Sequence, residues 1–362
     1  MRILVATGSS GGHVFPAISL LTELKMKYAD LEALLILPRD CILSGKDIFP
    51  CEVRYIPVSP IKFKLDLKNI VAVFNLLKGA CKSLFILMEF RPDVVVGFGS
   101  LVSIPVIIFA WLMRISTLIH EQNVVIGRSN RFLCAFADRI AVSFPQSRGY
   151  FRGRKDKIIY TGNPIRPELT KIDRSKALDF FGLGSDSFTI LAMGGSKGSH
   201  RINIEFLKAV AGISRGYKFQ VIHLCGQGDY DLLNQGYGEL DVRARLFSFL
   251  GPMHYAYSAS DLVLCRCGAL TISEIMFFAL PAILVPYPHA YAHQSANAMV
   301  LAEKGSAVII KDEELSAAVI KNKAEYFMAH QDELNNMRLS YRDFLITDAN
   351  RTLAEAVLAL AA

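Results

Sequence analysis

The chain has 362 residues, of which 52% are hydrophobic and 20% charged, and its formal net charge is +7. This composition excludes an intrinsically disordered chain, and the length favours two domains over one large core. The seven cysteines lack paired metal-ligand or disulfide spacing, which predicts a reducing, intracellular compartment, and we expect no signal peptide before the first apolar run.

Short apolar runs alternate with longer amphipathic stretches from the first residue onward. We expect strands at 1–7, 31–38, 92–99, 114–120 and 139–144, and helices at 15–28, 70–89 and 128–137. The runs are apolar at successive positions, as in parallel strands buried on both faces, so the alternation predicts a doubly wound α/β sheet. Residues 102–113 are very apolar but shorter than the roughly 20 residues of a membrane span, and we interpret them as a buried helix.

The same pattern restarts after the turn-rich segment 163–167. We expect further strands at 188–195, 219–226, 245–251, 261–266 and 281–288, and helices at 202–213 and 341–360. Two strand–glycine–helix openings, at 3–13 and 190–198, indicate two similar halves that face each other across a cleft.

The first glycine loop, Gly8-Ser9-Ser10-Gly11-Gly12-His13, follows the first expected strand. A glycine turn at the carboxyl end of a parallel strand exposes backbone N–H groups at the start of the next helix, and this arrangement binds anions. The loop matches neither the dinucleotide fingerprint nor the Walker loop. His13 is expected at the helix start, either as a functional group or as a structural histidine.

Three other segments place polar side chains after apolar runs. The second glycine loop, residues 194–199, repeats the first arrangement and offers Ser196 to a phosphate. The segment 120–123 (HEQN) is expected at the ligand-binding edge of the sheet. The segment 265–274 opens a helix and places Glu274 where a carboxylate can accept hydrogen bonds from ribose hydroxyls, with a solvated helix residue as the alternative.

The segment 289–297 follows the last apolar run of the second half. Gln294 and Asn297 are three residues apart on one helix face, a spacing at which amides can hold sugar hydroxyls. His289 and His293 are four residues apart, but no acidic third ligand is nearby in the sequence, so no metal site is predicted.

Taken in this order, the motifs resemble the MurG family, the inverting GT-B glycosyltransferases of peptidoglycan synthesis. The matching segments are GSSGGHVFPA, RPDVVVGFGSLVS, HEQN with Gly127 and Asn130, TGNPIR, GGSKGS, CRCGALTISE and HQSANA. The resemblance implies an α/β GT-B fold of two Rossmann-like domains with a cleft between them. It also implies an acceptor and membrane-facing domain of residues 1–161 plus 341–362 and a donor domain of residues 162–340.

The reaction follows from the same resemblance. GlcNAc moves from UDP-GlcNAc to the 4-hydroxyl of MurNAc in undecaprenyl-pyrophosphoryl-MurNAc-pentapeptide (lipid I), with inversion and without a cofactor or catalytic metal, and lipid II is formed. His13 is then the catalytic base, and the Leu250 backbone reads the uracil. The residues implied on the acceptor side are Gly99, Ser100, His120 and Glu121. The residues implied in donor binding are Ser10, Gly11, Gly12, Asn123, Arg166, Ser196, Leu250, Ala269, Leu270, Thr271, Glu274, Gln294 and Asn297.

Two loops depart from the family pattern. Ser9 and Ser10 stand where the family usually has the Gly and Thr of GGTGGH. The segment 99–101 lacks the usual paired glycines, and Ile104 stands where Gly is common. Because a Cβ atom restricts positive φ, these departures bear on the acceptor-side geometry.

Basic and apolar residues interleave between residues 61 and 85. The lysines of this stretch are Lys62, Lys64, Lys68, Lys78 and Lys82. Residues 1–161 hold 21 Lys and Arg against 12 Asp and Glu (net +9), whereas residues 162–362 hold 19 against 21 (net −2). Because lipid I is anchored in the membrane by its polyprenyl chain, the resemblance implies peripheral attachment to the cytoplasmic face of the bacterial inner membrane. The basic stretch is expected to dock on its anionic lipids, and no nucleic-acid partner is expected. The alternative is a core-facing helix with a solvated lysine face.

Two other functions stay open at this stage. A UDP-GlcNAc 2-epimerase of similar fold isomerises the UDP-sugar without a lipid acceptor, and a catalytically idle protein binds the UDP-sugar without turnover. The basic stretch and the first glycine loop favour the transferase over the epimerase. The loop departures favour the idle binder. For the transferase, the family implies a place in cell wall biogenesis, cell shape, cell division and the cell cycle.

Overall fold

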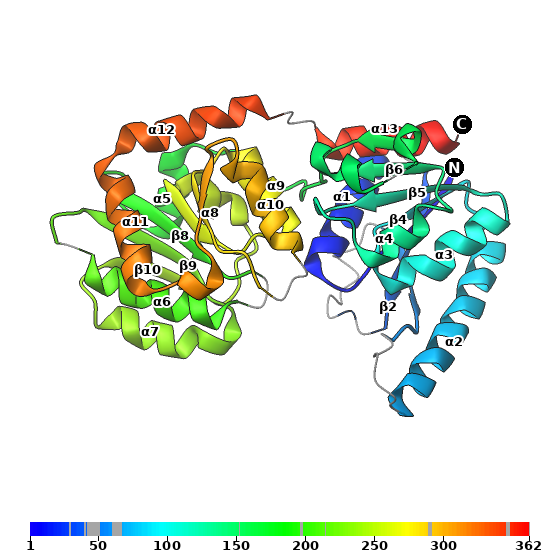
Figure 1. Ribbon diagram of the computed structural model, residues 1–362, viewed down its shortest axis with the longest axis horizontal. Helices are drawn as coiled ribbons and strands as arrows, with labels where there is room; N and C mark the ends of the chain where they lie inside the picture. Colours follow the sequence, from blue (N-terminus) through cyan, green and yellow to red (C-terminus); the bar gives the residue numbers. More distant parts are fainter. Residues whose placement is uncertain are drawn as a thin grey trace. The chain divides into compact units, whose positions relative to one another are not determined.

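The chain folds into two compact units. The computed structural model describes residues 1–28, 30–39, 41, 51–59, 67–151, 153–195, 198–213, 215–288, 292–344 and 348–361 (Figure 1). The first unit comprises Met1–Pro167 and Thr347–Ala362, and the second comprises Glu168–Ile346. These boundaries lie a few residues beyond those expected after residues 161 and 340. The segment before Pro167 stays with the first unit because the Ile165 carbonyl accepts a hydrogen bond from Asn350 Nδ2, 3.0 Å away.

The first unit is a parallel sheet with helices on both faces. Its elements are β1 (Arg2–Ala6), α1 (Gly11–Lys27), β2 (Glu32–Pro38), β3 (Glu52–Ile56), α2 (Leu67–Phe90), β4 (Val94–Gly97), α3 (Ser100–Leu112), β5 (Ser116–Glu121), α4 (Arg128–Leu133), β6 (Arg139–Val142), η1 (Pro145–Tyr150), η2 (Lys155–Lys157), β7 (Ile158–Tyr160) and α13 (Ala349–Ala361). The strand order is β3-β2-β1-β4-β5-β6-β7, with every pair parallel.

Alternate residues of β1 enter two different cores. Ile3 and Val5 are buried in the core covered by α1 and α13, whereas Leu4 and Ala6 are buried in the core covered by α2, α3 and α4. The continuous apolar run is therefore required, because both faces of the strand are covered. The C-terminal helix α13 packs beside α1, so both chain ends belong to this unit (Figure 1).

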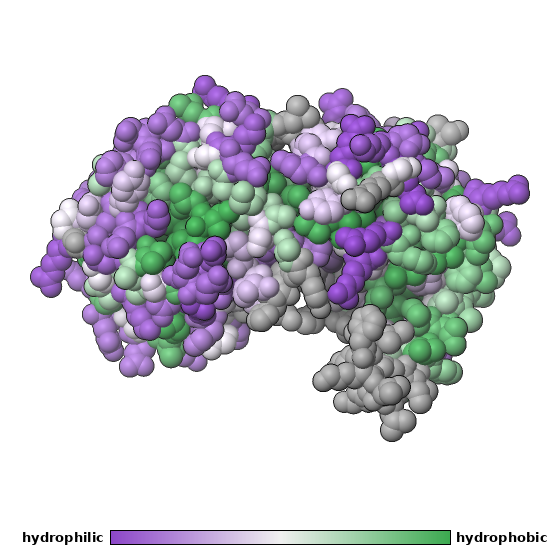
Figure 2. Space-filling view, in the orientation of Figure 1, coloured by the Kyte–Doolittle hydropathy of each residue, from purple (hydrophilic) through white to green (hydrophobic). Residues whose placement is uncertain are grey.

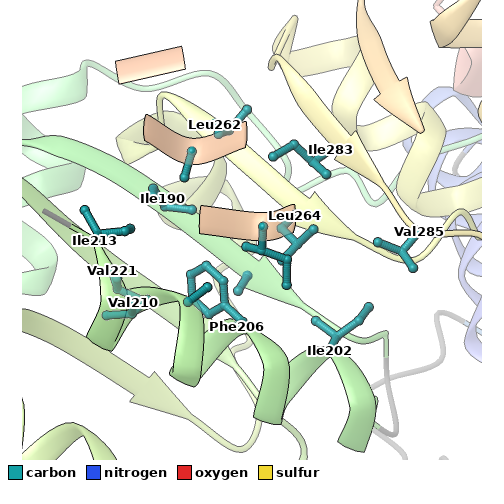
Figure 3. Packing of buried hydrophobic residues seen from close by; sticks show 14 of the residues in the cluster. Ile190, Ile202, Phe206, Val210, Ile213, Val221, Leu262, Leu264, Ile283 and Val285 are labelled. Atoms are coloured by element: carbon teal, nitrogen blue, oxygen red, sulfur yellow. The ribbon is translucent and has the colours of Figure 1, made fainter. Parts of the chain in front are cut away.

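The second unit repeats this architecture. Its elements are α5 (Arg174–Phe181), β8 (Phe188–Met193), α6 (His200–Gly212), β9 (Phe219–Leu224), η3 (Gln227–Asp229), α7 (Tyr230–Gly238), β10 (Arg243–Phe247), α8 (Met253–Ala259), β11 (Leu262–Cys265), α9 (Ala269–Phe278), β12 (Ala282–Leu284), α10 (His293–Ala302), β13 (Ala307–Ile309), η4 (Asp312–Glu314), α11 (Ala317–Ala329), α12 (Gln331–Ser340) and η5 (Tyr341–Asp343). The parallel strand order is β10-β9-β8-β11-β12-β13. On one face, Ile202, Phe206 and Val210 of α6 pack against Ile190 and Leu264 of the sheet (Figure 3).

The predicted pair of parallel α/β sheets is confirmed, and three details need correction. The expected helix at 128–137 is wrong at its end, because α4 ends at Leu133 and residues 134–136 form a turn. The expected helix at 341–360 is wrong at its start, because residues 341–343 form a 3₁₀ turn and α13 begins at Ala349. The short strands β3, β7 and β13 were not expected from the sequence. The partly exposed β3 contains Glu52 and Arg54 and lacks the apolar signal of the central strands, and β7 and β13 are only three residues long.

Candidate active site

Both glycine loops lie where the strand order of their own sheet reverses. In the first sheet β1 and β4 are neighbours, and the loops that follow them contain Gly8 and Gly99. In the second sheet β8 and β11 are neighbours, and the loops that follow them contain Gly198 and Gly268. Ligands of open parallel sheets bind at the carboxyl ends of the strands at this switch point. Each unit therefore presents one candidate half-site.

His13 lies in the first turn of α1, as the sequence predicts, and its tautomer is defined. The Nδ1 atom is 2.8 Å from the carbonyl oxygen of Phe98, which follows β4. A carbonyl can only accept a hydrogen bond, so Nδ1 bears the proton and Nε2 carries the basic lone pair of the neutral ring. A histidine in this state is suited to accept a proton from a hydroxyl group.

His120 supports this arrangement from inside the protein. Its side chain is fully buried, its Nε2–H donates to the Gly162 carbonyl (3.1 Å), and its Nδ1 accepts from Gln122 Nε2 (3.2 Å). Burial lowers the pKa of His120 from 6.5 to about 4, and the nearby His13 adds to this effect. The ring is therefore neutral at pH 7. The Gln122 amide also lies 3.4 Å from the Phe98 carbonyl that holds His13.

Glu121 organises the loop that follows β5. It is 1% exposed, and its carboxylate accepts from the backbone N–H groups of Asn123 (3.0 Å) and Gly127 (2.9 Å) and from Asn130 Nδ2 (2.9 Å). The segment 120–123 was expected after the strand with its side chains at the sheet edge. That placement is corrected, because His120 and Glu121 end β5 and point into the unit.

The loop between β4 and α3 has positive φ angles at both a glycine and the serine that follows it. Gly99 has φ +79° and Ser100 has φ +68°. A non-glycine residue in this region costs on the order of 1–3 kcal/mol, and such strain is typical of functional sites. A Cβ on Gly8 would come within 2.8 Å of the Ser100 Cβ, so the two loops are in direct contact. The departures at 99–101 thus leave the positive-φ turn in place.

The remaining expected residues of the first unit lie near this edge. Ser10 is the N-cap of α1 and is exposed, and Gly11 and Gly12 form the first turn. The half-buried Arg166 guanidinium lies 5.3 Å from the centre of the Phe15 ring of α1. Asn123 is half-buried, and its backbone N–H donates a hydrogen bond to the Glu121 carboxylate.

In the second unit the glycine loop packs closely on its neighbour. Gly198 has φ +77°, and a Cβ there would overlap the Cys225 carbonyl oxygen at the end of β9. Ser199 follows as the N-cap of α6. The expected phosphate contact Ser196 lies outside the described residues, as does His289.

The start of α9 is held by two amide side chains. Gln294 Oε1 accepts from the backbone N–H of Cys267 (3.0 Å) and of Tyr287 (2.9 Å), and Asn297 Nδ2 donates to the Cys267 carbonyl (3.1 Å). The backbone N–H and the backbone C=O of Cys267 are therefore both held, just before the Gly268 N-cap. Among the residues that the structure describes, none caps this helix start with its side chain. The first-turn amides of Ala269, Leu270 and Thr271 have no acceptor in the preceding turn, as at any helix N-terminus.

Two further expected residues flank this helix. Glu274 lies in the second turn of α9 and is 5% exposed, and its Oε2 accepts a hydrogen bond from Tyr257 Oη (2.6 Å). Leu250 lies in the turn between β10 and α8 and is 7% exposed. Beside it, the Phe249 side chain is 73% exposed.

Arg266 is a supporting residue that sequence reasoning missed. It is only 9% exposed, and its guanidinium pairs with Asp312 Oδ1 (2.6 Å) and donates to Ser199 Oγ (3.0 Å) and the Val285 carbonyl (3.3 Å). One arginine therefore ties the second glycine loop to the loops after β11, β12 and β13. Its sequence signal was its place within CRCGALTISE, to which no role was assigned.

The described residues contain no group of three or more His, Cys, Asp or Glu side chains that could hold a metal ion. The buried cysteines next to α9 have raised pKa values. Burial raises the pKa of the Cys267 thiol well above 9.0 and raises that of Cys265 as well. Thiols in this state are poor ligands and nucleophiles, which agrees with packing roles.

An exposed apolar face covers α2 and α3. It consists of Val71, Phe74, Leu77, Phe85, Met88, Trp111 and Leu112, each at least 46% exposed. Apolar side chains gather over these two helices in the surface view (Figure 2). The stretch Val71–Phe90 is long and apolar enough to cross a membrane by length and composition, which alone is weak support for a span. Ile86 and Leu87 on its other side are buried in the core of the first unit.

Comparisons with known proteins agree with this geometry. The family model for the N-terminal domain of glycosyltransferase family 28 matches residues 3–142, and the model for the C-terminal domain of that family matches residues 189–349. A curated relative from Desulforamulus reducens is 35% identical over 94% of this chain and 93% of its own length. One from Listeria monocytogenes is 34% identical over 99% of both chains. Both are named UDP-N-acetylglucosamine–N-acetylmuramyl-(pentapeptide) pyrophosphoryl-undecaprenol N-acetylglucosamine transferase.

Solved structures give the same result. The crystal structure of Acinetobacter baumannii MurG superimposes with a TM-score of 0.77 at 25% identity, covering 99% of both chains. A UDP-GlcNAc 2-epimerase from Neisseria meningitidis has a TM-score of 0.68 at 13% identity, a likeness of fold alone. The two sheets and their domain matches define a glycosyltransferase with two Rossmann-like domains. The chain belongs to the MurG family of glycosyltransferase family 28.

Proposed function

We propose that this protein transfers GlcNAc from UDP-GlcNAc to the 4-hydroxyl of MurNAc in lipid I and so forms lipid II. The observation that supports it most is the similarity to curated transferases of this name over 99% of the chain. The half-sites fit the reaction, because one unit offers a base and the other offers helix-end amides with a buried carboxylate.

The first unit supplies the proton acceptor. The acceptor hydroxyl oxygen attacks the anomeric carbon while its proton passes to Nε2 of His13. The bond between the anomeric carbon and the β-phosphate oxygen breaks, and its electron pair leaves with UDP. The Phe98 carbonyl, 2.8 Å from Nδ1, favours the imidazolium that forms. Attack opposite the leaving group inverts the anomeric centre.

The second unit binds the leaving group. The amides of Ala269, Leu270 and Thr271 at the start of α9 face the diphosphate, where the helix dipole stabilises its negative charge. Ser196 contributes to the same phosphates, Glu274 accepts the ribose hydroxyls, and the Leu250 backbone reads the uracil.

The donor sugar has a separate set of contacts. The amide side chains of Gln294 and Asn297 hold the start of α9 in place through the backbone N–H and C=O of Cys267. We place the sugar against Gln294, Asn123 and Arg166, whereas Asn297 is fully buried and acts indirectly through the Cys267 carbonyl that it holds. Ser10, Gly11 and Gly12 complete the donor contacts from the first unit, and Gly99 and Ser100 bind on the acceptor side. His120 and Glu121 act there indirectly, since both are buried supports.

The same proposal includes peripheral attachment to the cytoplasmic face of the bacterial inner membrane. The apolar face over α2 and α3 is half or more exposed at most of its residues, and Lys78 and Lys82 on α2 are exposed beside it. Lysines next to an apolar helix face favour anionic lipid surfaces. Lys62, Lys64 and the side chain of Lys68 lie outside the described residues.

An assay with radiolabelled UDP-GlcNAc and lipid I separates the possible activities. We expect the label in lipid II only when lipid I is present. Conversion of the UDP-sugar to its 2-epimer without lipid I, or binding without any product, would contradict the proposal. A reaction lacking lipid I and one lacking enzyme are the controls.

A further inference from the structure

Glu274 is hydrogen-bonded by a tyrosine that the proposed chemistry does not use. Tyr257 lies in α8 and is 2% exposed, and its hydroxyl donates to Glu274 Oε2 across 2.6 Å. A phenol that donates to a carboxylate makes a charge-assisted hydrogen bond, which is shorter and roughly twice as strong as a neutral one. The buried carboxylate thus gains a strong donor in place of water.

The Tyr257 hydroxyl is fixed by its own packing. The ring stacks on Phe278 of α9, with centroids 5.0 Å apart and an interplanar angle of 29°. The hydroxyl also lies 3.9 Å from Sδ of Met193 at the end of β8. Because Phe278 and Glu274 share one helix, the phenol is held against the element that carries the carboxylate. A side chain locked in this way pre-organises the group that it contacts.

We propose that Tyr257 is a positioning residue for nucleotide recognition, which orients the Glu274 carboxylate toward the ribose hydroxyls of UDP. This inference rests on the proposed function, since it takes Glu274 as the ribose acceptor. A carboxylate that is already ordered loses less rotamer freedom when the nucleotide binds. Tyr257 therefore increases the difference in affinity between nucleotides that have ribose hydroxyls and nucleotides that lack them.

The test compares UDP with 2′,3′-dideoxy-UDP by isothermal titration calorimetry of the full chain. For Tyr257→Phe we expect UDP binding to weaken about 5–30-fold, which is part of the stabilisation that one hydrogen bond to a charged group provides. Binding of dideoxy-UDP should change less than about two-fold, because that ligand has no hydroxyl for Glu274. Tyr255→Phe is the matched control on the same helix, since Tyr255 stacks on Phe180 instead. It should leave both affinities unchanged.

A double variant connects Tyr257 to Glu274. In the Glu274→Gln background, Tyr257→Phe should cause no further loss of UDP affinity. Equal losses for both nucleotides, no loss for UDP, or a lower melting temperature with an unchanged UDP to dideoxy-UDP ratio would overturn the inference. Wild-type protein that binds both nucleotides equally also overturns it but leaves the transferase proposal standing. Wild-type protein that binds neither nucleotide overturns both.

Discussion

The proposed chemistry depends on one backbone atom, the carbonyl oxygen of Phe98, which fixes the tautomer of His13. It accepts from His13 Nδ1 and lies within 3.4 Å of Gln122 Nε2. The sequence indicates that His13 starts a helix, but it cannot show which ring nitrogen bears the proton. That choice is made by a backbone atom 85 residues away in the chain.

Replacing His13 tests its role as the base. His13→Ala should lower kcat about 10²–10⁴-fold, the usual contribution of a general base, while the Kd for UDP stays nearly constant. Steady-state kinetics and calorimetry measure the two effects. His330→Ala, at an exposed histidine of the second unit, is the control. A His13→Ala enzyme within a few-fold of the wild-type rate would assign the proton to another group.

His120 predicts how stability depends on pH. Its folded pKa of about 4 lies below the ordinary 6.5, so the unfolded chain binds more protons between these values. Stability is therefore lost as pH falls from 6.5 toward 4, with His120 contributing about 2 kcal/mol of that loss at pH 5. Urea unfolding at pH 5 and 7 should show a smaller difference for His120→Gln than for wild type. An unchanged difference, or one also reduced in His330→Gln, would refute this assignment.

At the scale of elements, the glycine loops differ in why they need glycine. Gly195 has φ +90° with open space around its Cβ position, whereas Gly198 combines φ +77° with the Cys225 carbonyl. Gly195→Ala should cost about 1 kcal/mol of unfolding free energy for backbone strain alone. Gly198→Ala should cost clearly more, because β9 or the loop must also move. Denaturant unfolding compares them, and equal losses would show that the loop adjusts freely.

Helix α2 is the element with the clearest surface prediction. Leu77 and Phe85 are 61% and 62% exposed on its apolar face. Changing both to Gln should weaken binding to vesicles that contain anionic lipid by at least about 10-fold, since two large apolar side chains no longer enter the lipid. Vesicle co-sedimentation measures this. The control is Leu232→Gln, a 53% exposed leucine of the second unit, and an equal loss there would contradict α2 docking.

At the scale of the whole molecule, each unit is an α/β sheet with its own switch-point site. The first unit is assembled from two chain segments, because α13 returns to pack beside α1 and buries Leu353, Ala354 and Val357. In the proposed reaction the positive charge forms on His13 in the first unit, and the negative charge of the UDP leaving group is stabilised by the second unit. In this proposal the backbone amides and the dipole of α9 stabilise the diphosphate, a role that divalent ions fill in other enzymes.

Removal of metal ions tests whether backbone amides, and not a divalent ion, stabilise the diphosphate. Dialysis against EDTA should leave the rate of GlcNAc transfer within about two-fold, and added Mg²⁺ or Mn²⁺ should not raise it, because helix-end amides stabilise the leaving group. Initial rates with and without each ion are the measurement. A loss of more than 10-fold that Mg²⁺ restores would show that an ion takes part.

The sequence by itself determined the family, the two parallel sheets and the loops at their edges. Continuous apolar runs, glycine turns and motif order are local properties, so they can be read without coordinates. Only the tertiary structure decided that His120 and Glu121 are buried supports, that Arg266 joins several loops, and that Tyr257 contacts Glu274. The contact of Tyr257 with Glu274 joins residues 17 positions apart, and that of Arg266 with Asp312 joins residues 46 positions apart. Parallel strand pairing with its helix crossovers brings such distant residues together. No local pattern in the chain records them.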